Sequence, residues 1–247
     1  NASMKKKSTR DDNFRRKNKA YKNAKMTYAG RLDPMASGLL LVLVGDFVQQ
    51  KEKYLGLSKE YKFDVLFGFA TDTYDILGRV IESSGVGLIH KKNSLDKRIK
   101  ESLEFFTGKF MQSYPMYSSK TVAGKPLFAY AREGKIIESP RHRVIVKSLK
   151  FLRLRKISAK NLLENIACRI VKVKGDFRQA EIFRIWRKKL RINIKTRNKF
   201  FLASFHMKCG SGTYVRAIAN DFGQHIGIPS LAFTIKRTKI GNWSQVE

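Results

Sequence analysis

The segment 30–38, GRLDPMASG, is the feature that most constrains this chain. It places one carboxylate, Asp33, on a short loop between two glycines, directly before the apolar run 39–45, LLLVLVG. Two interpretations of Asp33 are open. It can form a turn with Pro34 or cap a helix, which are the commonest uses of such a residue. Alternatively, it is a reactive group held at the end of a tight loop.

The overall charge bears on this choice. The chain of 247 residues carries 51 Lys and Arg against 20 Asp and Glu, a formal net charge of +31. A field of this sign attracts nucleic acid, which releases counterions when it binds. A single acid on a glycine-flanked loop of so basic a protein suggests chemistry on a polyanion. A merely basic soluble protein, or one that binds anionic membranes, is the plainer alternative.

Length and composition set further bounds. The chain is long enough for one large domain or two small ones, and 43% hydrophobic residues are enough to build a core. Neither a membrane-spanning apolar stretch nor the apolar centre of a signal peptide is found. Cys168 and Cys209 are far apart and form neither a zinc pattern nor a disulfide framework. We therefore predict a cytoplasmic protein without a metal site or membrane contact.

The pattern along the chain predicts an α+β fold, because strands and helices alternate irregularly. Residues 1–25 are strongly basic and are expected to be flexible, and residues 26–247 to form the folded domain. The run 39–44 is compatible with a strand or with the start of a buried helix. Ser94 is expected to cap one helix, and Asp176 with Gln179 to cap another that runs through Leu190. Strands are predicted over residues 61–68, 79–81, 144–154 and 200–209. The helix that Ser94 would cap is predicted over residues 95–106, and further helices over residues 128–134 and 217–226.

Five segments, in order, resemble the TruB family of pseudouridine synthases. The segment 28–38, YAGRLDPMASG, resembles the catalytic loop of that family, and 59–63, KEYKF, its tyrosine motif. The segment 71–75, TDTYD, with Gly78, is similar to the loop that follows. Residues 112–140 resemble an RNA-contacting thumb, and 212–216, GTYVR, the arginine motif. Any one match is a weak signal, but five in the same order are specific.

The resemblance implies a pseudouridine-synthase fold, with a mixed, mainly antiparallel sheet, flanking helices and a catalytic cleft. It implies that Asp33 acts on the ribose of an extruded uridine, either by attacking C1′ or by taking a proton from C2′. Arg216 would orient that carboxylate through a charged hydrogen bond. Tyr61 would stack on the base and assist removal of the C5 proton. The reaction is an isomerisation, so no cofactor is expected.

The resemblance also implies a substrate, the T-loop of tRNA at uridine 55, and a base that is flipped out of its stack. No protein partner is implied, and a monomer is expected. The residues expected to contact the RNA are Tyr28, Arg31, Lys120, Lys125, Arg132, Arg141 and Arg143.

The chain departs from the family pattern at several points. The N-terminal strand with a Lys-Pro motif is missing before the catalytic loop, and Tyr28 stands where bacterial members have histidine. Arg31 replaces the usual threonine, a form seen in sister families that act on ribosomal RNA. The chain ends soon after Trp243, so we expect no C-terminal PUA domain. Without that domain we expect weaker binding of tRNA, which the basic insertion 172–198 is expected to offset in part.

Three other functions remain open at this point. The first is a non-catalytic RNA chaperone on the same fold, which the atypical N-terminus favours. The second is a ribosomal or assembly protein that binds RNA by charge alone and needs neither Tyr61 nor Arg216. The third is a pseudouridine synthase for ribosomal RNA, suggested by Arg31.

Overall fold

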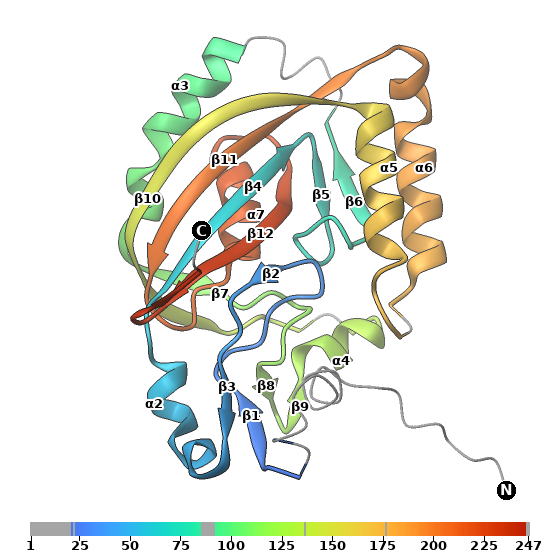
Figure 1. Ribbon diagram of the computed structural model, residues 1–247. Coiled ribbons are helices and arrows are strands. Elements are labelled where there is room, and N and C mark those ends of the chain that lie inside the picture. The colour runs from blue at the N-terminus through green and yellow to red at the C-terminus, as the bar shows by residue number, and fades with distance from the viewer. Residues whose placement is uncertain (1–20, 22, 85–91, 136, 176, 246–247) are drawn as a thin grey trace, which may run out of the picture. The chain divides into compact units, whose positions relative to one another are not determined.

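The computed structural model describes residues 21, 23–84, 92–135, 137–175 and 177–245 (Figure 1). Most of the predicted basic segment 1–25, together with Asp176 of the expected capping pair, lies outside the described residues. The chain divides into two compact units. The first comprises Asn1–Arg31 and Leu40–Leu57, and the second comprises Leu32–Leu39 and Ser58–Glu247.

The first unit contains a small antiparallel ribbon. Strand β1 (Met26–Tyr28) pairs with β3 (Val42–Val44), and the 3-10 helix η2 (Gly45–Gln50) and helix α2 (Lys51–Leu55) follow. Part of the apolar run 39–44 is therefore a strand, one of the two structures that its pattern allowed. Leu43 is its buried residue.

The second unit is built on a seven-stranded sheet. Every neighbouring pair is antiparallel except β2 with β12, which confirms the predicted mixed, mainly antiparallel α+β architecture. The predicted strands 61–68, 144–154 and 200–209 are present, the second of them extended at both ends. The strands follow one another across the sheet as β13 (Trp243–Ser244), β12 (Ser230–Ile240), β4 (Lys59–Phe67), β11 (Lys199–Cys209), β10 (Arg141–Ser158) and β7 (Gly108–Ser113), with β2 (Ser37–Gly38) beside β12.

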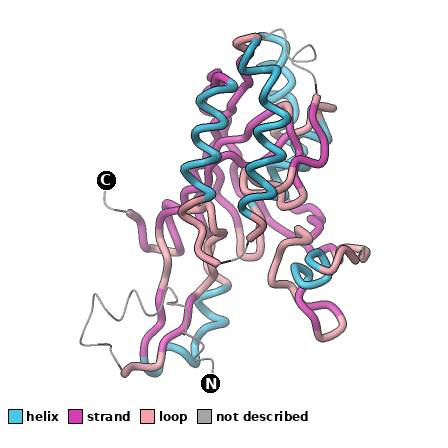
Figure 2. Tube along the Cα trace, turned by 90° about the vertical axis from the view of Figure 1, so that its right-hand side faces the viewer, coloured by secondary structure: helices cyan, strands magenta, loops and turns pink. Residues whose placement is uncertain are grey.

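The two faces of this sheet differ in chemistry, because side chains alternate along a strand. The face of β4 that carries Tyr61 and Phe63 packs against helices α7 (Val215–His225) and α3 (Lys92–Ser102) in one apolar cluster. The opposite face carries Lys62, Asp64 and Leu66 in turn. Helices α5 (Ala159–Ile170) and α6 (Gln179–Lys195) lie side by side and belong to the cluster around Leu66 (Figure 2).

The helices correct several expectations. Ser94 does not cap α3, because the helix has already begun at Lys92. The expected helix over residues 95–106 ends at Ser102 and is followed by the 3-10 helix η4 (Glu104–Phe106). Helix α5 was not predicted, although Ser158 accepts a hydrogen bond from the backbone N–H of Asn161 as an N-cap should.

The basic insertion contains helix α6, whose apolar stripe buries Ile182, Trp186 and Leu190. Its N-cap position is Arg178, while the Gln179 side chain accepts from the backbone N–H of Phe177. The stripe is therefore part of the core, as apolar residues at helical spacing usually are.

Shorter elements connect the sheet to its loops. The strands β5 (Phe69–Thr71) and β6 (Val80–Ser83) form a hairpin around the loop 72–79. The thumb-like segment holds the hairpin β8 (Thr121–Val122) and β9 (Lys125–Pro126), followed by helix α4 (Leu127–Arg132). None of the helices in the described part of the chain combines the length and the apolarity that crossing a bilayer requires.

Gly38 lets the loop that carries Asp33 lie directly against strand β12. The backbone N–H of Leu39 donates to the Arg237 carbonyl at 2.9 Å, and Gly38 has a φ of +100°. A Cβ at Gly38 would stand 2.2 Å from the Arg237 carbonyl oxygen. Both the backbone conformation and the close approach therefore require glycine.

We expect Gly38→Ala to lower the free energy of unfolding by about 3 kcal/mol, since backbone strain and a backbone clash add. Gly134→Ala is the matched control, because Gly134 has a φ of +70° but nothing within 4 Å of its added Cβ. Strain alone predicts a cost of about 1 kcal/mol there. Urea denaturation measures the free energy of unfolding of both variants. An equal decrease in the two would contradict the claim that the Arg237 carbonyl leaves no room for a Cβ at Gly38.

Candidate active site

Asp33 and Arg216 form an ion pair, although they are far apart in sequence. The Asp33 Oδ1 accepts a hydrogen bond from the Arg216 Nη2 at 2.9 Å. The Arg216 side chain is 4% exposed, whereas that of Asp33 is 30% exposed. A buried guanidinium thus holds a carboxylate that remains open to solvent, which orients a reactive oxygen toward a ligand.

Backbone carbonyls and a second carboxylate fix Arg216. Its Nη1 donates to the Thr73 carbonyl at 2.7 Å, and its Nη2 also donates to the Tyr117 carbonyl at 3.2 Å. The Arg216 Nε lies 3.8 Å from the Asp75 Oδ2. Burial alone would lower the pKa of Arg216, but the charges of Asp33 and Asp75 raise it above its ordinary value. The guanidinium is therefore charged and rigidly placed.

Asp75 supplies the buried negative charge on the far side of Arg216. It is 3% exposed, and its Oδ1 accepts from the Thr73 hydroxyl and the Leu77 N–H, each at 2.8 Å. Burial raises the pKa of Asp75 to about 6, although the charge of Arg216 acts in the opposite direction. Asp75 therefore structures the loop 72–79 through these two hydrogen bonds and also contacts Arg216.

This raised pKa predicts an unusual dependence of stability on pH. Asp75 is protonated more readily in the folded state, at about 6, than at its ordinary value of 3.8. Its contribution to stability is therefore complete below pH 3.8 and is lost as the pH rises through 6. Asp75→Asn keeps an acceptor oxygen but cannot titrate. The unfolding free energy of the parent protein minus that of this variant should rise by about 2 kcal/mol from pH 7 to pH 4. Denaturation curves at four pH values test this, and a difference independent of pH would contradict it.

Residues at the start of helix α6 and within it bind the loop 72–79, whose Thr73 carbonyl accepts a hydrogen bond from Arg216. The Arg178 Nη1 donates to Asp72 Oδ2 at 2.7 Å, and Arg79 Nε donates to the same oxygen at 3.0 Å. The Trp186 indole N–H donates to the Gly78 carbonyl at 3.1 Å. The basic insertion therefore fixes the loop 72–79, and through its carbonyl at Thr73 the position of Arg216.

Tyr61 lies on the same face of the sheet as α7, directly across from Arg237 in the register of β4 and β12. Burial raises the pKa of Tyr61 to about 12; the negative charge of Asp33 adds to this, and the charge and hydrogen bond of Arg237 oppose it. Tyr61 is therefore a neutral phenol at physiological pH. Asp33 thus bonds to Arg216 and its charge acts on Tyr61, and the catalytic roles of the three residues stay predictions. Tyr61 is only 8% exposed, and its stacking on a base stays a prediction.

Arg237 is the site residue that sequence reasoning missed. It is 2% exposed, and its Nε donates to the Leu39 carbonyl at 2.8 Å, so it joins the Asp33 loop to β12, the strand beside the one that carries Tyr61. A signal was available, since Ile235 and Arg237 share the buried face of a strand. A cation at a core-facing position calls for a functional explanation.

The residues expected to contact RNA fall into three places. Tyr28 and Arg31 belong to the first unit. Lys120 lies over the Tyr114 ring at 5.3 Å, and Lys125 is ion-paired with Glu133. Arg132 lies over the Phe128 ring on α4, while Arg141 and Arg143 lie on β10, beside β7. Their contacts with RNA stay predictions.

Comparison with known proteins decides the family. A model described as TruB family pseudouridylate synthase (N terminal domain) matches residues 17–176, more than half of the chain. The chain belongs to the TruB family. The Asp33 loop, Tyr61 and the loop 72–79 all lie inside the matched range, whereas Arg216 and Arg237 lie outside it.

TruB relatives align over nearly the whole chain. A tRNA pseudouridine synthase B of Ligilactobacillus salivarius is 31% identical over 225 residues, which cover 91% of this chain and 61% of that protein. The one from Aquifex aeolicus is 30% identical over 226 residues, 92% of this chain and 62% of that protein. The chain therefore spans about three fifths of the length of these relatives.

A solved structure supports the fold. The crystal structure of a Cbf5-Nop10-Gar1 complex matches 96% of this chain and 46% of that chain, with a TM-score of 0.51 and 15% identity. At this identity the likeness concerns the arrangement of the elements only. It agrees with the pseudouridine-synthase fold that the five motifs implied.

Proposed function

We propose that this protein isomerises uridine to pseudouridine in the T-loop of tRNA, at position 55. The observation that carries the proposal is the Asp33 carboxylate, partly exposed and bonded at 2.9 Å to the buried guanidinium of Arg216. Membership of the TruB family and relatives named tRNA pseudouridine synthase B support the substrate.

The reaction breaks the bond between C1′ of the ribose and N1 of uracil and forms a bond between C1′ and C5. Asp33 either attacks C1′ and forms an ester, whose C1′–O bond breaks when C5 attacks C1′, or removes a proton from C2′ to give a glycal and returns that proton to C2′ when C5 attacks C1′. In both routes the uracil leaves with the electron pair of N1, turns and rejoins through C5. The proton lost from C5 is balanced by one gained at N1, so nothing is oxidised or reduced.

Each side chain of the site has a part in this scheme. Arg216 is a positioning residue that fixes the attacking oxygen of Asp33, because a misplaced nucleophile loses much of its advantage. Tyr61, a neutral phenol, would stack on the base and assist removal of the C5 proton. Arg237 lies opposite Tyr61 in the strand register and donates to the Leu39 carbonyl, so it holds the Asp33 loop against the strand next to Tyr61.

The proposal is tested by mapping pseudouridine in RNA incubated with the purified protein. We expect an unmodified tRNA transcript to acquire pseudouridine at uridine 55, detected by chemical labelling and mass spectrometry. Total RNA from a strain without this activity is treated in parallel. New pseudouridine in ribosomal RNA alone would favour the alternative raised by Arg31. RNA that binds but is recovered unchanged would favour a chaperone.

A further inference from the structure

We propose that the sheet carries a second RNA-backbone surface, on the face opposite to Tyr61. We call it the Lys62 face and define it by Lys62, Lys150, Arg153 and Lys236, all of which are exposed. Figure 1 looks onto this face, with β10, β11, β4 and β12 in front of α7. The inference rests on the proposed function only in the choice of tRNA as the ligand.

The register of the strands places three of these cations, Lys236, Lys62 and Lys150, in one row, whereas Arg153 lies opposite Ser204. Lys236 of β12 lies opposite Lys62 of β4, Lys62 opposite His206 of β11, and His206 opposite Lys150 of β10. Neighbouring strands are only about 4.8 Å apart, and like charges directly opposite each other destabilise a sheet. An anionic ligand across the row would relieve that repulsion.

The carboxylates of these strands are already engaged. Glu60 and Asp64 are the acidic residues of β4, β10, β11 and β12. Glu60 pairs with His206 at 3.1 Å and Lys208 at 3.4 Å. Asp64 accepts from the hydroxyl groups of Ser204 at 2.6 Å and Thr234 at 2.8 Å, and from Arg155 at 3.0 Å. Both carboxylates therefore interact with neighbouring side chains of the sheet. Since the four strands carry no other acidic residue, the Lys62 face has an excess of positive charge.

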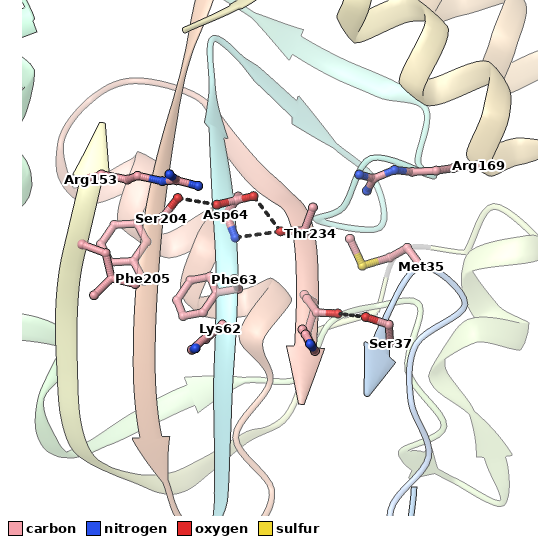
Figure 3. A pocket seen from close by; sticks show the side chains of 13 residues that line it. Met35, Ser37, Lys62, Phe63, Asp64, Arg153, Arg169, Ser204, Phe205 and Thr234 are labelled. Atoms are coloured by element: carbon pink, nitrogen blue, oxygen red, sulfur yellow. Dashed lines mark hydrogen bonds between the residues drawn. The ribbon is translucent and has the colours of Figure 1, made fainter. Parts of the chain in front are cut away.

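A pocket of 580 Å³ opens on this face (Figure 3). Its lining includes Lys62, Arg153 and Lys236, together with Arg169 of helix α5, and it includes none of the three catalytic residues. Arg169 lies over the Phe233 ring at 4.5 Å, which fixes its guanidinium in place. Cations from three strands and a helix line this one pocket, an arrangement that suits a phosphodiester group.

RNA fits this surface better than an acidic protein does. Stable protein interfaces are centred on buried apolar and aromatic anchors, and lysine is depleted in them. The defining residues here are three lysines and one arginine, which contact phosphates as charges without requiring a base sequence. The expected ligand is therefore the backbone of the RNA, outside the loop that contains the target base.

The test compares two triple variants with equal loss of charge. Lys62→Gln, Lys150→Gln and Lys236→Gln remove the row, whereas Lys97→Gln, Lys100→Gln and Lys160→Gln remove three cations from α3 and α5. Binding of an unmodified tRNA transcript is measured across a range of salt concentrations. We expect the first variant to lower the slope of log K against log salt by about 3, or about 1 for each phosphate that is no longer neutralised. The second should leave the slope nearly unchanged.

Other outcomes would overturn the inference. An equal decrease of the salt slope in both triple variants would show that tRNA binding depends on net charge alone and not on the Lys62 face. Retained tRNA binding by the first variant, or tight binding of polyglutamate in place of RNA, would also reject it. Single-turnover rates at saturating RNA should be the same in the first variant and the parent protein. The two proposals can fail separately. If the parent protein forms no pseudouridine but the first variant lowers the salt slope as expected, the proposed reaction is wrong and the proposed RNA surface is supported.

Discussion

Asp33→Asn is expected to abolish pseudouridine formation, with single-turnover rates at least about 1,000-fold below the parent protein. The amide has nearly the same shape and can still contact Arg216, but it is a poor nucleophile and a poor base. Binding of tRNA should change little, because one exposed charge among many contributes little to the salt slope. Rates are measured with enzyme in excess over a tRNA labelled at uridine 55.

Asp96→Asn is the matched control for this variant. The Asp96 side chain is 30% exposed, as is that of Asp33, and it forms an ion pair with Lys100 on helix α3. It should keep the full rate. A fully active Asp33→Asn protein would reject the enzymatic proposal, whichever RNA is used.

Substitutions of Arg216 should have the second largest effect. Arg216→Lys keeps the charge but cannot serve Asp33 and the carbonyls of Thr73 and Tyr117 together, because an ammonium lacks the planar fork. We expect kcat to fall at least about 100-fold while KM changes little, since the residue positions Asp33. Arg216→Met should also cost about 3–5 kcal/mol of stability, because it leaves Asp75 buried without a cation.

A double variant separates these two roles of Arg216. Asp75→Asn combined with Arg216→Met removes both buried charges, so stability should recover by a few kcal/mol relative to Arg216→Met alone. Activity should not recover, since Asp33 still lacks its guanidinium. Denaturation curves and single-turnover rates on the same preparations give both quantities. Recovery of activity together with stability would mean that Arg216 acts only on the fold.

The secondary structure was predictable where the pattern was regular. The strands predicted over residues 61–68 and 200–209 are β4 and β11. Burial alternates along β4 over residues 59–65, as a strand with one buried face should show, whereas β11 is buried on both faces over residues 200–205. Local signals were less decisive at helix ends. Serine is a common N-cap residue, but Ser94 lies inside α3. Ser158 does cap a helix, and the sequence did not predict this because Ser158 ends a long strand.

The site was predictable in its parts but not in its connections. Asp33, Tyr61 and Arg216 each belong to a motif that could be read in the sequence. The bracing of the loop 72–79 by Arg178 and Trp186 depends on how α6 packs against the sheet. No periodicity along the chain reports that packing. The burial of Arg237 had a sequence signal, but its position opposite Tyr61 did not, because it depends on the register of two strands that are distant in sequence.

The sequence by itself determined the family, the main strands and the chemical groups available for catalysis, since these depend on residue type and on neighbours a few positions away. Only the tertiary structure decided that Asp33 meets Arg216 across 183 positions, that Asp75 is buried beside them, and that Lys236, Lys62 and Lys150 form one row. Such contacts depend on strand register and core packing. These are fixed by the sum of many distant interactions and not by any local pattern.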